Sequence, residues 1–181
     1  MPTLLEQDYF RKTGKYKKVY LWNVFFDPGL KFLYWFRKAQ NSSDKSPLGI
    51  FYRIILRRYQ IKYGFQISAK TQIDGGLYLG HWGTVVVNPK AKIGKNCNLA
   101  HGVTIGQTNR GENAGVPQIG NNVWIGTNAV IVGGITIGNN VLIAPNSYVN
   151  QNIEDDSIVF GNPISIKKSE NATDGYLNNK V

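Results

Sequence analysis

The sequence predicts a mainly β protein, a left-handed parallel β-helix of hexapeptide repeats preceded by a short α-helical region. Two observations lead to this prediction: an aliphatic residue recurs every six positions between Ile67 and Val149, and a basic, aromatic first third lacks the repeat. The length of 181 residues suits one domain with a substantial core. We expect a helical region over 1–62, a β-helix over 63–168 and a flexible tail over 169–181.

The N-terminal third is expected to be helical because it carries helix-start signals. Asp27-Pro28 and Ser46-Pro47 each place a capping side chain before a proline, which is well tolerated at the first helical position. After the second signal, apolar residues recur at helical spacing and predict one buried face. These residues are Leu48, Phe51, Tyr52, Ile55, Leu56 and Tyr59. Gly64 is the expected helix stop.

The repeat of six begins after Gly64. Its aliphatic positions are Ile67, Ile73, Leu79, Val87, Ile93, Leu99, Ile105, Ile119, Ile125, Ile131, Ile137, Ile143 and Val149. A strand of a β-sandwich would show a period of two instead. Three hexads make one triangular coil, with the aliphatic side chains inside and the coils stacked about 4.8 Å apart. Cys97 occupies an inward-pointing place and is predicted to belong to the core.

Two interruptions break the repeat. Two extra residues fall between Leu79 and Val87, and we assign them to Val85 and Val86. A longer insertion forms an excursion loop over 107–117, which is polar and rich in glycine. Loops that leave a rigid scaffold often carry function, so this loop is a candidate part of a site.

The only two histidines occupy equivalent places in adjacent coils. His81 and His101 are each third in their hexads, and we expect their Cα atoms to lie about 5 Å apart, near the start of the excursion loop. Histidine titrates near neutral pH and can take a proton from a hydroxyl or amine nucleophile. Both are therefore candidate catalytic residues, with His81 as the base. The alternative is a pair of surface side chains that bond to backbone carbonyls.

Positive charge is concentrated at the N-terminus. The net charge is +10, and residues 1–66 hold 13 Lys and Arg against 4 Asp and Glu, together with 16 of the 22 aromatic residues. A helical cap with a solvated face and a peripheral contact with an anionic membrane both remain open, whereas we do not expect nucleic-acid binding. One cysteine, no secretory signal and no apolar segment of spanning length predict a cytoplasmic protein, at the inner face of the membrane if the second explanation holds.

Five short motifs lie within Tyr63–Lys168. They are Gly80-His-Trp-Gly83, Ile93-Gly-Lys-Asn96, Gly102-Val-Thr-Ile-Gly106, Val116-Pro-Gln-Ile-Gly120 and Gly161-Asn-Pro163. Their order and spacing resemble the hexapeptide-repeat acyltransferases, in the serine acetyltransferase-like branch that includes polysaccharide O-acetyltransferases. The resemblance implies a homotrimer of parallel prisms with acetyl-CoA, the co-substrate, held between two of them. It also implies that His81 deprotonates the acceptor for direct transfer, without a metal.

The chain departs from the serine acetyltransferases at three places. By its resemblance to these enzymes, the chain should carry an Arg-His pair where it has Gly115 and Val116. It should also carry an aspartate in place of Gly80 and an acidic partner of the histidine near Gln66. Without the Arg-His pair, the carboxylate of a free amino acid has no cationic side chain to bind. We therefore expect an acetyl-CoA-dependent O-acetyltransferase for a sugar hydroxyl, on a small-molecule or lipid-linked acceptor in surface polysaccharide biosynthesis. A serine O-acetyltransferase of cysteine biosynthesis is the alternative.

The remaining site residues follow from this resemblance and from side-chain chemistry. Trp82 is expected to stack on a sugar ring, and Glu112 to pair with a histidine across a subunit boundary. Candidate acetyl-CoA contacts are Gly106, Gly126 and Ala144, which let the pantetheine arm approach the backbone, and Lys167 and Lys168, which suit phosphates. The simpler alternatives are a Trp buried between subunits, a solvated acid, glycines that the fold requires and a free basic tail.

Two other classes of protein can have this fold. A zinc enzyme of the same shape binds its metal through three histidines, more than this chain holds, so we expect no metal site. A non-catalytic scaffold would need neither paired histidines nor a groove for acetyl-CoA.

Overall fold

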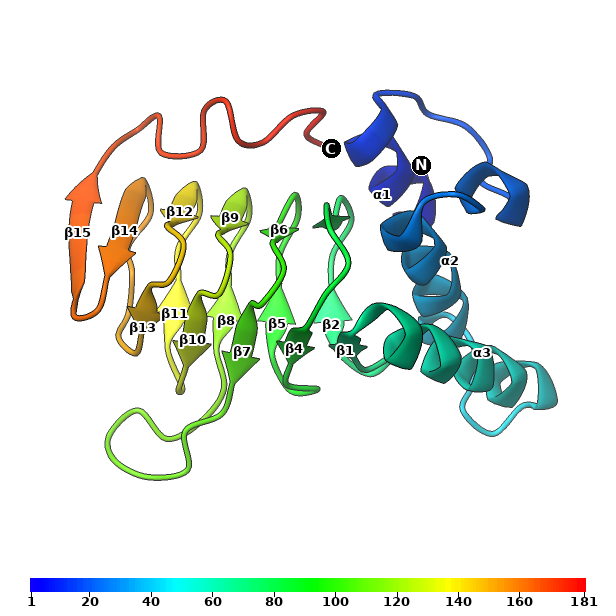
Figure 1. Ribbon diagram of the computed structural model, residues 1–181, viewed down its shortest axis with the longest axis horizontal. Coiled ribbons are helices and arrows are strands. Elements are labelled where there is room, and N and C mark those ends of the chain that lie inside the picture. Colours follow the sequence, from blue (N-terminus) through cyan, green and yellow to red (C-terminus); the bar gives the residue numbers. More distant parts are fainter.

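The computed structural model describes residues 1–181 and shows a parallel β-helix with helices at one end (Figure 1). Three α-helices come first, α1 (Leu4–Thr13), α2 (Pro28–Gln40) and α3 (Pro47–Tyr63), with a short 3₁₀ helix, η1 (Leu21–Val24), before α2. The predicted fold class, a mainly β solenoid preceded by a helical region, is confirmed. No helix combines the length and the apolar character needed to cross a bilayer.

Each of the three sheets takes every third strand, as a triangular coil requires. Sheet A contains β1 (Phe65–Ile67), β4 (Val85–Val87), β7 (Thr104–Gly106), β10 (Val130–Val132) and β13 (Tyr148–Val149). Sheet B contains β2 (Gln72–Ile73), β5 (Lys92–Ile93), β8 (Gln118–Ile119) and β11 (Thr136–Ile137). Sheet C contains β3 (Tyr78–Leu79), β6 (Asn98–Leu99), β9 (Val123–Ile125), β12 (Val141–Ile143), β14 (Ser157–Gly161) and β15 (Ile164–Lys168). The strands pair in parallel until β15 turns back antiparallel on β14 and ends the solenoid.

The predicted aliphatic positions form three ladders inside the prism. In sheet C, for example, Leu79 pairs with Leu99, which pairs with Ile125 and then Ile143. Every member of the three ladders is at most 4% exposed. Burying one such side chain stabilises the fold by about 1.5 to 3 kcal/mol, so the ladders supply much of the core. Cys97 is also fully buried, as predicted, and burial raises the pKa of its thiol to about 12.

The predicted helix boundaries before the solenoid are confirmed. Asp27 accepts a hydrogen bond from the Leu30 amide at 2.8 Å, and Ser46 accepts one from the Gly49 amide at 3.0 Å. Gly64 ends α3 with φ +78°, and a Cβ there would lie 2.8 Å from the carbonyl carbon of Gly83 in the first coil. Glycine is thus needed both for the left-handed backbone and for the close approach.

The predicted apolar face of α3 is only partly buried. Leu56 is 2% exposed, whereas Leu48 and Phe51 are 56% and 49% exposed. The reason is that α3 packs mainly along α2, where Trp35 contacts the side of α3 that carries Tyr52 and Tyr59. Five apolar side chains of α3 remain exposed: Leu48, Ile50, Phe51, Ile54 and Ile61.

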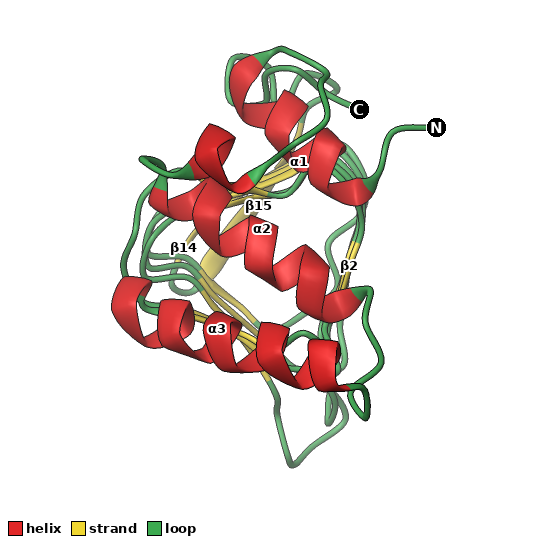
Figure 2. Ribbon diagram, turned by 90° about the vertical axis from the view of Figure 1, so that its right-hand side faces the viewer, coloured by secondary structure: helices red, strands yellow, loops and turns green.

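The helices close the open end of the first coil, as Figure 2 shows in the view onto them. Phe32 and Phe36 of α2 and Phe65 of β1 are fully buried against one another, with ring centroids 5.0 to 6.0 Å apart. One continuous cluster of buried apolar residues runs from the helices into the prism. The cap and the solenoid therefore share one core and form one folding unit.

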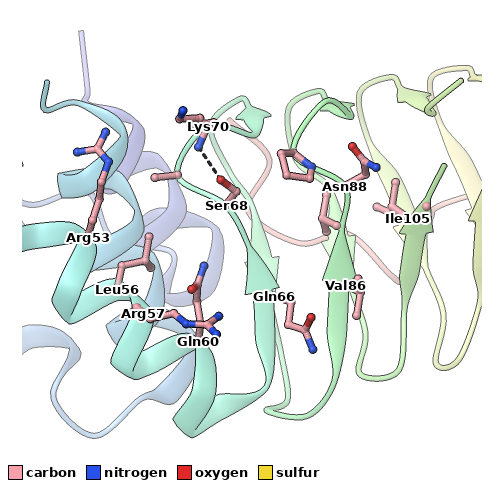
Figure 3. A pocket seen from close by; sticks show the side chains of 14 residues that line it. Arg53, Leu56, Arg57, Gln60, Gln66, Ser68, Lys70, Val86, Asn88 and Ile105 are labelled. Atoms are coloured by element: carbon pink, nitrogen blue, oxygen red, sulfur yellow. Dashed lines mark hydrogen bonds between the residues drawn. The ribbon is translucent and has the colours of Figure 1, made fainter. Parts of the chain in front are cut away.

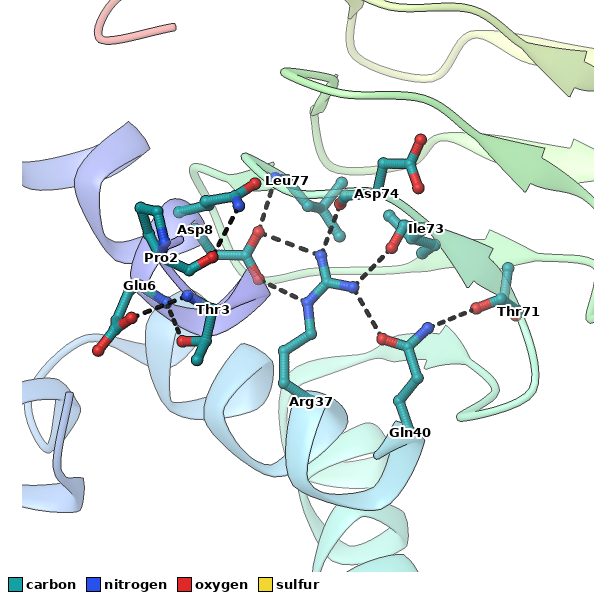
Figure 4. Close-up of polar contacts among 11 residues, drawn as sticks. Pro2, Thr3, Glu6, Asp8, Arg37, Gln40, Thr71, Ile73, Asp74 and Leu77 are labelled. Atoms are coloured by element: carbon teal, nitrogen blue, oxygen red, sulfur yellow. Dashed lines mark hydrogen bonds and ion pairs between the residues drawn. The ribbon is translucent and has the colours of Figure 1, made fainter. Parts of the chain in front are cut away.

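A buried ion pair also joins α1 and α2 to the first coil (Figure 4). Asp8 and Arg37 form a bidentate pair, with Nε–Oδ2 at 2.7 Å and Nη2–Oδ1 at 3.1 Å. Arg37 also donates to the main-chain oxygens of Ile73 and Asp74, and the Leu77 amide donates to Asp8. Burial raises the pKa of the Asp8 carboxyl, and Arg37 opposes that effect. Each partner is stable in the interior only because the other is present.

The C-terminal residues 169–181 differ from the flexible tail that the sequence predicted. They run back along the coils and end beside α1 (Figure 1). Thr173 is fully buried and its hydroxyl donates to Asn140 at 2.7 Å, while the Tyr176 and Trp124 rings lie 4.8 Å apart. The missed signal is a set of asparagines at left-handed turn positions, which offer side-chain groups to the returning chain. They include Asn96 and Asn140.

Replacing one partner of the Asp8–Arg37 pair should destabilise the protein strongly. We expect Arg37→Met to lower the free energy of unfolding by about 3 to 5 kcal/mol, because it leaves the Asp8 carboxylate buried without a counter-ion. Urea unfolding followed by circular dichroism measures this. The control is Lys168→Met, which removes an exposed ion pair with Glu154 and should change stability little. Equal effects of the two variants would contradict this role of the pair.

Candidate active site

The structure brings the two histidines together at the corner between sheets C and A. His81 follows β3 and His101 follows β6, the next strand in the same sheet. Their ring centroids lie 5.9 Å apart and the rings are nearly perpendicular, at 89°. Both residues are exposed. A substrate therefore has open access to both imidazoles.

The corner that carries His81 is longer than the corresponding corner of the next coil. Strand residues on both sides of the turn pair in register with the next coil. Between the same two paired positions, the chain advances by seven residues on the first coil but by only five on the second. The two extra residues thus lie within the turn over 80–84, which includes His81 and Trp82. The assignment to Val85 and Val86 was wrong, because these valines continue the ladder of sheet A.

The lengthened turn lies directly over His101. A Cβ on Gly83 would stand 3.1 Å from the Cβ of His101, and Gly83 has φ +142°. Trp82 is 67% exposed beside His81. His81, Trp82 and His101 line a hollow of about 230 Å³. The indole is therefore available as a flat apolar platform at the histidine pair.

The excursion loop over 107–117 leaves the coil at a different corner. It connects β7 to β8, between sheets A and B, whereas the histidines lie between sheets C and A (Figure 1). The expectation that it lies near the histidines of its own chain was wrong, because a whole strand separates the two corners. Thr108 and Gly115 bond to each other and make the loop a small hairpin, with Glu112 exposed near its tip. Glu112 and the histidines of one chain are therefore not neighbours.

A second hollow extends from the histidines across the outer face of sheet C. It measures about 240 Å³, and its wall includes Tyr78, Asn98 and Trp124. These three residues are aligned in register on adjacent strands. These residues were not predicted as part of the site, although each directly precedes an inward-pointing aliphatic residue in every third hexad and therefore points outward. They give the site an aromatic and amide surface.

A line of small residues continues along the histidine corner towards the C-terminal coils. Gly126 and Ala144 follow Ile125 and Ile143, which stack in register with the coils of the histidines. A Cβ on Gly126 would lie 2.6 Å from the nitrogen of Pro145, so the fold itself requires this glycine. Gly106 is not part of this line, because it ends β7 in sheet A.

Gly106 instead lines the largest hollow, of about 650 Å³, between α3 and sheet A (Figure 3). Arg53, Arg57 and Lys70 supply its only charged side chains. Arg53 donates to main-chain oxygens of the α2–α3 connection and of α3 itself, so it is partly engaged. Gln66, at the place where the resemblance expects an acid, also lines this hollow.

The two candidate lysines lie on β15, at the end of the solenoid opposite the helices (Figure 1). Lys168 is engaged, since its Nζ lies 2.7 Å from Glu154 and 2.9 Å from the main-chain oxygen of Asp155. Lys167 is exposed. No group of three His, Cys, Asp or Glu side chains within residues 1–181 is arranged to hold a metal ion.

Comparison with known proteins gives one family model and many relatives. Residues 117–151 match the model of the bacterial transferase hexapeptide, six repeats. The chain is 36% identical over 132 residues to WcaB of Escherichia coli K12, whose name assigns it, provisionally, to acetyl transfer in colanic acid biosynthesis. This match covers 72% of the chain and 78% of WcaB. The serine acetyltransferase of Staphylococcus xylosus is 35% identical over 118 residues, covering 65% of the chain and 55% of that enzyme.

Solved structures give the same pattern of similarity. The serine acetyltransferase of Neisseria gonorrhoeae superposes with a TM-score of 0.72 at 26% identity, covering 92% of this chain and 64% of that one. The Brucella abortus serine acetyltransferase in complex with coenzyme A gives a TM-score of 0.72 at 26% identity, covering 92% and 65%. This chain therefore spans about two thirds of the serine acetyltransferase structures that it matches.

Proposed function

The chain belongs to the hexapeptide-repeat acetyltransferases, and on that premise we propose that it transfers the acetyl group of acetyl-CoA to a sugar hydroxyl in surface polysaccharide assembly. The observation that carries the proposal is the exposed Trp82 platform beside the perpendicular His81–His101 pair. A flat aromatic surface suits the apolar face of a sugar ring. The colanic acid relative supports the same acceptor class.

In the proposed mechanism, His81 acts as general base. An imidazole nitrogen takes the proton of the acceptor hydroxyl, whose oxygen forms a bond to the carbonyl carbon of the thioester. The carbon–sulfur bond breaks, and the imidazolium returns the proton to the departing sulfur. His101, with its ring 5.9 Å away, helps to position the acceptor and the base.

Acetyl-CoA is proposed to lie along the corner that leads away from the histidines. Gly126 and Ala144 leave room for the pantetheine arm to approach the backbone there. Lys167, exposed on β15 further along the solenoid, is the better candidate for a CoA phosphate, because Lys168 is already paired with Glu154. A relative solved with coenzyme A supports the donor.

We propose that the working unit is a homotrimer. The excursion loop and the histidines of one chain occupy different corners, so Glu112 can approach a histidine only from a neighbouring copy. An acceptor site between two prisms would then draw on both chains.

L-serine is the alternative acceptor, since several relatives bear that name. A serine carboxylate needs a cationic anchor, and Gly115 and Val116 offer none. This departure favours the sugar.

We propose a cytoplasmic location at the inner face of the membrane. The segment over 15–26 interleaves exposed aromatics with lysines: Trp22, Phe25 and Phe26 are 70%, 54% and 94% exposed. Such a surface suits anionic headgroups and the bilayer interface.

Removal of the base should impair acetyl transfer. We expect His81→Ala to lower kcat/KM at least about 100-fold, the usual scale for a lost general base, without unfolding the exposed corner. His101→Ala should cost less. Steady-state release of CoA measures both, with circular dichroism as the check of folding. Near wild-type turnover in folded His81→Ala would exclude this mechanism.

The rate at which free CoA is released in the presence of each candidate acceptor shows which acceptor the enzyme prefers. Methyl glucoside and amino sugars should stimulate release more than L-serine, because the loop lacks the carboxylate anchor. The variant Trp82→Ala should raise KM for sugars. Efficient turnover of L-serine without any response to sugars would establish the alternative.

Membrane contact is tested by vesicle flotation. Binding to anionic vesicles should exceed binding to zwitterionic ones and should weaken as salt rises, because salt screens the lysines. Trp22→Ser with Phe26→Ser should reduce it. The matched control is Tyr148→Ser, which removes an exposed aromatic from the prism. If the protein binds neither vesicle type at low salt, the membrane contact is refuted and the helical region serves only as a cap.

A further inference from the structure

Arg11, near the end of α1, is a buried cation without a carboxylate partner. It is 2% exposed, and none of the four ion pairs in the structure includes it. Its Nη2 donates to Asn98 Oδ1 at 2.7 Å and its Nη1 donates to the main-chain oxygen of Asn178. Its Nε has no partner at all. A buried charge normally carries a counter-ion, so this arrangement is unusual.

The surroundings of Arg11 are cationic and aromatic. Lys12 adjoins it, and both cations lie over the Tyr78 ring, at 5.7 and 5.4 Å from its centroid. Lys12 forms an ion pair with Asp27, with Nζ–Oδ2 at 2.6 Å, whereas Arg11 has no such partner. Burial lowers the pKa of Arg11 because it disfavours the charged form. A bound anion would relieve that cost.

Arg11 and Lys12 open into a hollow of about 290 Å³ on the outer face of sheet C. No aspartate or glutamate lines it; asparagines and two tyrosines complete its wall. Tyr78 and Asn98 line both this hollow and the one that contains the histidines. Tyr78 and His81 both line the second of these hollows, so the two hollows adjoin each other next to the histidines.

We propose that the Arg11–Lys12 hollow binds a negatively charged group of the acceptor, a carboxylate or phosphate on a sugar that reaches the histidines. The inference rests on the proposed sugar O-acetyltransferase function and narrows it to anionic saccharides. Asn98 and Tyr78 form the passage between the anion and the reacting hydroxyl. The Arg11 guanidinium lines the hollow, and its remaining N–H donors suit the oxygens of a carboxylate or phosphate.

The test measures binding without acetyl-CoA, so that it does not depend on acetyl transfer. Methyl glucuronide and methyl glucoside differ only in the carboxylate, and calorimetry at constant ionic strength compares their dissociation constants. We expect the full-length protein to bind the glucuronide at least about tenfold more tightly, the scale of one charge-assisted hydrogen bond. Glucose phosphate and inorganic phosphate show which anion fits better.

Two variants and one control assign the preference to this hollow. Lys12→Gln and Arg11→Gln should each reduce it at least several-fold, whereas Lys90→Gln, the same charge change on an exposed turn of the prism, should preserve it. Lys12 is partly exposed, so its variant remains informative if Arg11→Gln fails to fold.

The outcomes separate this inference from the proposed function. Equal binding of the two glycosides, or a preference that survives both substitutions, would overturn the anion subsite. A purely structural Arg11 would weaken both glycosides alike and leave their ratio unchanged, which would also overturn it. A glucuronide preference that depends on Lys12, in a protein that acetylates no sugar, would uphold the subsite and refute the proposed function.

Discussion

The buried pairing of Asp8 with Arg37 is the contact on which the placement of the other parts depends. A solenoid has an open first coil, whose main-chain groups and aliphatic side chains need a cover. Arg37 satisfies the carbonyl oxygens of Ile73 and Asp74 on that coil, and Asp8 satisfies the amide of Leu77. The pair thereby fixes α1 and α2 on the prism, and with α1 it fixes Arg11 against the outer face of sheet C.

The site owes its form to a departure from the regular repeat. If the repeat were strictly six residues long, the turns that carry the two histidines would have the same length and would lie close to the prism surface. Two additional residues in the turn of His81 lift Trp82 into solvent while the strands on either side stay in register. The rigid ladders hold the turn in place, so the irregular corner leaves the packing of the core unchanged. The neighbouring coils then supply the small residues and the aromatic wall.

Periodicity predicted those parts of the protein in which each residue repeats one environment. The ladders, the burial of Cys97 and the meeting of the histidines follow from a spacing of six. Capping signals predicted the starts of α2 and α3 and the end of α3, and Thr3 with Glu6 forms a capping box that also marks the start of α1. Contacts between distant segments determine the position of the extra residues and the path of the tail. They also determine that Arg11 is buried without a carboxylate partner. Local patterns do not encode such contacts, and the corner of the excursion loop required counting strands around the triangle.

The returning tail changes the way the molecule should come apart. In an ordinary solenoid each coil touches only its neighbours, so terminal coils can open one at a time. Here the segment after β15 runs back past the intervening coils, bonds to Asn140 and Asn96, and reaches α1 through Arg11. Detaching the last coil therefore disturbs contacts at the first. The returning tail thus couples the first and last coils directly. The two ends of the solenoid should therefore unfold together, and partly opened forms should be scarce.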